Sequence, residues 1–226
     1  MTHETFTPLV RIGTVCLLPI VCLAAGFRAA GSVVRERERR TLDGLLVLPV
    51  TRERILGAKW LGSVLRMRHL LYGLGALWLV GVCIGALHPG ALVLLVLTAA
   101  AHVSFVASLG VWVSVTARNT LRANFMMAAF LLLFFGGSCL LWISAGAPSA
   151  KNLDPIESLF QIGLNPWRSW WSSALPLLPP ANLEQREAER TALLISAAGA
   201  VVFALPAAGF WQLAVILLRR EQGTRA

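Results

Sequence analysis

The side chains best suited to polar chemistry gather in one stretch, residues 35–59, where charged groups alternate with leucines. The stretch opens with mixed charges that include Glu36 and Glu38, and Thr41 follows as a residue able to cap a new helical turn. Three leucines then recur at helical spacing and make one apolar edge: Leu42, Leu45 and Leu46. Pro49 ends that turn. The pattern predicts a short amphipathic helix at the cytoplasmic face, packed on lipid headgroups.

We expect no catalytic residue on this chain. A Walker A loop ends in Gly-Lys-Ser/Thr, whereas Lys59 and Lys151, the two lysines of the sequence, each follow an alanine. The sequence also lacks the signatures of serine hydrolases and zinc peptidases. The four cysteines lie far apart inside apolar runs, which predicts neither a metal site nor a cofactor. If ATP drives this protein, a partner must hydrolyse it.

His102 is the ionisable residue placed deepest in a long apolar segment. At such a depth an ionisable group is a candidate for a transport pathway. The alternative is a neutral histidine that forms a hydrogen bond with a nearby hydroxyl or backbone carbonyl, and the segment offers no acidic partner for a proton relay. Both interpretations stay open from the sequence.

The composition is that of a membrane protein. The 226 residues are 57% hydrophobic and only 14% charged, with a mean hydropathy of +0.70, whereas about 25% of residues are charged in soluble domains. A membrane-spanning helix needs about 20 apolar residues, and five segments qualify: residues 9–34, 70–87, 91–116, 123–146 and 191–218. The second is expected to be the apolar end of a longer helix that begins near Arg52. We therefore predict a single all-α domain, residues 1–226, built as a polytopic bundle of about five spans.

The distribution of charge predicts the orientation of these spans. Nine basic residues lie between positions 35 and 68, and further arginines follow the third and fifth segments, whereas residues 88–90 and the first ten residues carry no Lys or Arg. The net charge of +9 is thus explained by cytoplasmic loops rather than by nucleic acid. We expect a cell membrane of the bacterial inner-membrane type, an outer N-terminus and a cytoplasmic C-terminus. Residues 147–187, with a tryptophan cluster, would form an outer-face loop.

The charged stretch resembles the cytoplasmic segment of ABC-2 type transporter permeases. The residues that carry the resemblance run without a gap: Glu36-Arg37-Glu38, Thr41-Leu42-Asp43, Leu45-Leu46, Pro49 and Arg52-Glu53-Arg54-Ile55-Leu56-Gly57-Ala58-Lys59. The resemblance implies that residues 35–59 contain a coupling helix, which sits in a cleft of the partner ATPase. Two departures are Arg40, where the family usually has glycine, and five expected spans where members typically have six. Residues 117–120 resemble the family more weakly.

The resemblance implies a function. The chain would be the membrane-spanning permease subunit of an ATP-binding-cassette exporter, embedded in the lipid bilayer. It would pair with a second permease subunit, identical or different, and with a separate ATPase subunit. Two alternatives remain: a polytopic membrane enzyme that acts on lipids or peptides, and a non-transporting membrane anchor for an ATPase.

Overall fold

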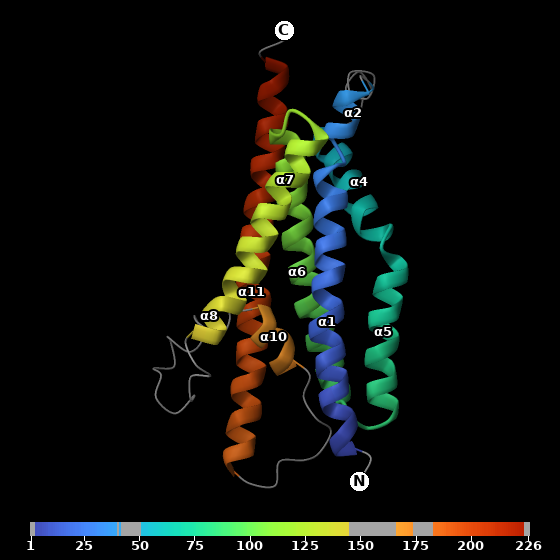
Figure 1. The fold of residues 1–226 in the computed structure, drawn as a ribbon, viewed down its shortest axis with the longest axis vertical. Helices are drawn as coiled ribbons and strands as arrows, with labels where there is room; N and C mark the ends of the chain where they lie inside the picture. Colours follow the sequence, from blue (N-terminus) through green and yellow to red (C-terminus); the bar gives the residue numbers. More distant parts are fainter. Residues whose placement is uncertain (1–2, 40, 42–50, 145–165, 174–182, 224–226) are drawn as a thin grey trace. The chain divides into compact units, whose positions relative to one another are not determined.

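The computed structural model describes residues 3–39, 41, 51–144, 166–173 and 183–223 (Figure 1). Every element in these ranges is helical, which confirms the all-α prediction. In chain order the helices are α1 (His3–Ala30), α2 (Val34–Glu38), α4 (Arg52–Leu65), α5 (Arg68–Cys83), α6 (Pro89–Thr116), α7 (Thr120–Leu131), the π-helical turn η1 (Leu132–Gly136), α8 (Gly137–Ser144), α10 (Pro166–Ser173) and α11 (Leu183–Gly223).

Within the described ranges, four helical segments are long and apolar enough to cross a membrane. They are Phe6–Glu38, Pro89–Thr116, Thr120–Leu140 and Ser196–Leu218. They correspond to four of the five segments expected from hydropathy. The protein is therefore a multi-pass membrane protein.

The remaining expected span, residues 70–87, differs from the prediction. It is represented by α5, an apolar helix of only 16 residues, and the long helix expected from Arg52 is divided at Arg66 and Met67. At this break the Arg66 carbonyl accepts a hydrogen bond from Arg28 (3.3 Å). The turn that follows α5 contains Gly85. Its φ of 76° lies in the left-handed region, which glycine adopts readily.

The chain forms two compact units, and α1, α6 and α11 contribute residues to both. The first unit contains Met1–Ile20, Leu70–His102 and Leu133–Phe203. In it, the buried Trp78 of α5 donates a hydrogen bond from Nε1 to the Thr14 hydroxyl of α1 (3.0 Å). A buried indole N–H needs such a partner, so this bond fixes α5 beside α1.

The second unit contains Val21–His69, Val103–Leu132 and Ala204–Ala226. Its apolar core joins α1, α4, α6 and α11 through these buried residues: Ala29, Val33, Leu56, Val111, Val115, Ala214, Val215 and Leu218. Helices α1 and α6 approach closely at Gly110, where an added Cβ would lie 2.7 Å from both the Cβ of Ala29 and the carbonyl oxygen of Gly26. Small residues permit this close approach.

Candidate functional site

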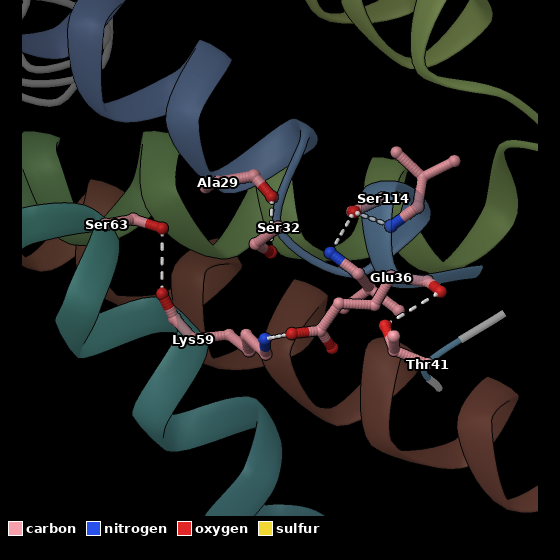
Figure 2. A network of polar contacts seen from close by, with 9 residues as sticks. Ala29, Ser32, Glu36, Thr41, Lys59, Ser63 and Ser114 are labelled. Atoms are coloured by element: carbon pink, nitrogen blue, oxygen red, sulfur yellow. Dashed lines mark hydrogen bonds and ion pairs between the residues drawn. The ribbon is translucent and has the colours of Figure 1, made fainter. Parts of the chain in front are cut away.

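The charged end of the second unit is organised around the break between α1 and α2. The first backbone N–H groups of a helix have no partner inside that helix. At α2 they are satisfied by a side chain of α6: the buried Ser114 hydroxyl accepts hydrogen bonds from the N–H groups of Val33 (2.9 Å) and Val34 (3.0 Å). Figure 2 shows this contact. Ser114 therefore positions α2 and the charged side chains that α2 carries.

Glu36, in the first turn of α2, faces α4. Its Oε1 forms an ion pair with the Lys59 ammonium (Figure 2), and both side chains are about three-quarters buried. The Glu36 backbone carbonyl accepts hydrogen bonds from the Thr41 N–H (3.0 Å) and hydroxyl (3.3 Å). Glu36 thus links α2 to α4 and also holds the chain where it leaves α2.

Arg37, the next residue, turns toward the end of α6. Its two terminal nitrogens donate hydrogen bonds to the carbonyl oxygens of Ala117 (2.8 Å) and Val115 (3.2 Å). The last carbonyls of a helix lack partners within it, and a guanidinium can satisfy two of them at once because its donors form a rigid planar fork.

Glu38 faces the beginning of α7. Its Oε1 accepts the Thr120 N–H (2.6 Å), while its Oε2 accepts the Thr120 hydroxyl (2.5 Å). Next to it, the Asn119 side chain caps α7 by accepting the Arg122 N–H (2.8 Å). Three consecutive charged residues therefore contact three different helices. We call the group Glu36, Arg37, Glu38, Lys59, Ser114 and Thr120 the polar junction.

His102 lies in the first unit and is fully buried. Its Nδ1 donates a hydrogen bond to the Thr98 carbonyl oxygen (2.7 Å), since a carbonyl can only accept. The ring packs against Phe203 (4.1 Å between centroids) and meets Trp170 edge-on (5.1 Å). This is the geometry of the alternative stated above, a histidine bonded to a backbone carbonyl. The pathway role stays a prediction.

Neither site suggests bond-making chemistry. Among the described residues, no three His, Cys, Asp or Glu side chains lie close enough together to hold a metal ion. The polar junction pairs its charges with one another and with helix ends, which is an arrangement that positions helices.

Comparison with known protein families identifies the family of this chain. A family model described as ABC-2 family transporter protein matches residues 4–218. The chain belongs to this family. No curated protein matches the sequence. The ABC-2 family assignment makes the chain a membrane permease of an ABC transporter, and it confirms the resemblance drawn from residues 35–59.

The residues that the ABC-2 resemblance singled out are distributed as follows. Glu36 and Glu38 lie in the polar junction, and Thr41 contacts it through Glu36. Leu42, Leu45, Leu46 and Pro49 lie outside the described residues. Ser114 was missed by sequence reasoning, because a lone serine in a span carries no signal of its partner. The helix start expected near Arg52 is present, since α4 begins at that residue.

Proposed function

We propose that this ABC-2 permease is an exporter subunit, that a separate ATPase drives it, and that residues 41–48 form its coupling helix. One observation carries the proposal. The chain on both sides of residues 42–50 is fixed to the same helical framework: α2 is bound to α6 and α7 through Arg37 and Glu38, and α4 is bound to α2 through Lys59. A segment held at both ends can pass a displacement to the helices that hold it.

The proposed mechanism follows from these links. ATP binding would close the ATPase and displace the coupling helix. Because ion pairs and charge-assisted hydrogen bonds join α2, α4 and the α6–α7 turn, these helix ends would move together as one body. Rigid movement of helices around a central pathway is the usual basis of alternating access. Two such permease subunits, identical or different, would enclose the pathway.

The orientation and the substrate belong to the same proposal. The arginine-rich end would lie in the cytoplasm, since basic loops are retained there, with the N-terminus outside the cell membrane and the C-terminus inside. A bundle of such apolar composition suits lipids, lipophilic compounds or peptides alike, and we infer export as the direction.

The decisive test is recovery of the ATPase with the permease. Full-length protein is purified from its native membrane in wild-type form and as Leu45→Asp/Leu46→Asp, at matched membrane expression, and a co-purifying ATPase is identified by its Walker A peptide. Burial of each leucine contributes about 1.5–3 kcal/mol, and a carboxylate in an apolar cleft adds a desolvation cost. The double variant should therefore lose the ATPase.

Leu121→Asp is the matched control. Leu121 is 80% exposed on α7, outside residues 41–48, so the same chemical change there should leave ATPase recovery intact. Equal recovery with the double variant would reject the coupling helix and favour the membrane-enzyme or anchor alternatives. Stoichiometric ATP binding by the isolated chain would contradict the proposal that a separate subunit binds and hydrolyses ATP. If substrate stimulates ATP hydrolysis by the reconstituted complex, the chain is a transport subunit. A membrane anchor for an ATPase would show no such stimulation.

A further inference from the structure

An open cavity of about 500 Å³ lies in the second unit, between the end of α1, α2 and α4. Five of the described residues that line it are basic: Arg28, Arg35, Arg39, Lys59 and Arg66. Glu36 is the one acidic residue in this described lining. The volume falls within the range of about 300–1,000 Å³ that is typical of ligand sites.

The positive charge of this cavity is left largely uncompensated. Lys59 is neutralised by Glu36, and Arg28 donates a hydrogen bond to a neutral group, the Arg66 carbonyl. Glu38 attracts Arg35 and offsets part of its charge, but Glu38 does not line the cavity. Four guanidinium groups therefore surround a space whose described lining offers them no further carboxylate. An excess of positive charge around one cavity favours the binding of an anion.

The shape of the lining distinguishes this cavity from ordinary arginines at a membrane surface. Arginines that extend separately toward headgroups lie along the rim of a bundle. Here they line one cavity from α1, α2 and the C-terminal end of α4, and small residues lie among them in the lining: Gly31, Ala58 and Gly62. An added Cβ at Gly62 would meet nothing within 4 Å. Guanidinium groups bind phosphate oxygens through paired hydrogen bonds.

We infer that this cavity is a binding site for a phosphate group, and that the headgroup of an anionic phospholipid supplies it. The cavity lies at the arginine-rich end of the candidate span Phe6–Glu38, and basic pockets between helices at the cytoplasmic face bind such headgroups. The inference rests on the proposed orientation, which places this end at the cytoplasmic face, but not on transport, because it concerns binding to this chain alone.

Binding can be measured on the purified full-length protein in detergent. Dioctanoyl phosphatidylglycerol is titrated as the anionic probe, dioctanoyl phosphatidylcholine as the zwitterionic probe and inorganic phosphate as the free anion. Wild-type protein should bind phosphatidylglycerol at least tenfold more tightly than phosphatidylcholine. The variant Arg28→Gln/Arg35→Gln/Arg39→Gln should lose at least tenfold in affinity for phosphatidylglycerol. Arg118→Gln/Arg122→Gln, which removes exposed charge that does not line the cavity, should bind as wild type does.

The binding results distinguish a lipid headgroup from free phosphate and test the site itself. Inorganic phosphate that displaces the lipid only at much higher concentration supports the headgroup as the source, whereas equal affinity for inorganic phosphate keeps the site and assigns it to a free phosphate. Unchanged lipid affinity in the triple variant, or equal binding of both lipids by wild type, overturns the inference. If the triple variant cannot be purified, Arg39→Gln, exposed just after α2, should still weaken binding about threefold.

Discussion

The Glu38 carboxylate accepts two hydrogen bonds from Thr120, one from its backbone N–H (2.6 Å) and one from its hydroxyl (2.5 Å), although 82 residues separate the two in the sequence. Both donors belong to the first residue of α7. The contact therefore fixes the beginning of α7 against α2, and it turns an apparently ordinary surface glutamate into a structural residue.

Substitution of Thr120 tests how much its contact with Glu38 contributes to stability. Thr120→Val removes the hydroxyl bond, keeps the backbone N–H and preserves the shape of the side chain. We expect a lower melting temperature in detergent and weaker coupling of ATP hydrolysis to transport. Thr120→Ser keeps both donors and should behave as wild type does. A valine variant that melts with wild type would show that the hydroxyl bond is dispensable.

Reversal of charge tests the Glu36–Lys59 pair. Exposed ion pairs contribute about 0–1 kcal/mol and loss of one partner from a fully buried pair costs about 3–5 kcal/mol, so Glu36→Lys or Lys59→Glu should each cost about 1–3 kcal/mol. The combined reversal should recover part of that loss. Thermal unfolding of the four proteins gives the coupling energy, and strictly additive effects would mean that the two groups do not interact.

Arg37 should not tolerate lysine. Its two donors reach two carbonyls at the end of α6, and an ammonium group cannot reproduce this planar fork. Charge-assisted hydrogen bonds contribute about 1.5–3 kcal/mol, so Arg37→Gln should lose about that much and Arg37→Lys only somewhat less. Arg118→Gln, at an exposed neighbouring position, is the control and should leave the melting temperature unchanged. Full stability of Arg37→Lys would argue against the fork geometry.

Gly110 should be sensitive to a single methyl group. In Gly110→Ala the new Cβ meets backbone atoms of α1, which cannot move aside as a flexible side chain would. Such overpacking costs about 1–3 kcal/mol. Gly209→Ala, in α11, places its Cβ in open space and should be neutral or stabilise the helix by up to about 1 kcal/mol. Equal melting temperatures for both variants would contradict the close packing of α1 and α6.

The orientation of the chain is accessible to labelling. Single cysteines at Thr2, His88 and Thr224, in a background without the native cysteines, should react with an impermeant reagent from outside at the first two positions only. The reason is the arginine bias of the intervening connections. Outside labelling at Thr224, or protection of both other positions, would reverse or reject the orientation.

Hydropathy predicted five spans, and four of them are present as long apolar helices, because burial in lipid requires long apolar runs and a run is visible in one sequence. It could not predict the division of the helix at Arg66 and Met67, since residues 52–87 continue the pattern of charged start and apolar end. The break involves a contact with Arg28 of α1, 38 residues away, and no local rule reveals such a contact.

The charged stretch illustrates the same limit at the candidate site. The sequence located Glu36 and Glu38 through their family pattern but did not identify their partners within the chain. The structure pairs them with Lys59 and Thr120. A charged side chain such as Glu36 or Glu38 is expected to have a partner. Which residue becomes that partner depends on helix packing, including the close approach of α1 and α6.

The order of the charges in the polar junction has its own consequence. A helix carries partial negative charge at its C-terminus and partial positive charge at its N-terminus. The Arg37 side chain contacts the C-terminal end of α6, and the Glu38 side chain contacts the N-terminal end of α7. Each side chain therefore carries the charge that is attracted to the partial charge of that helix end. An exchange of the two residues would keep composition and net charge and yet place both charges against the wrong poles. The order Arg37-Glu38 thus matches the order of the helix ends: the negative end of α6 comes first along the chain, and the positive end of α7 follows.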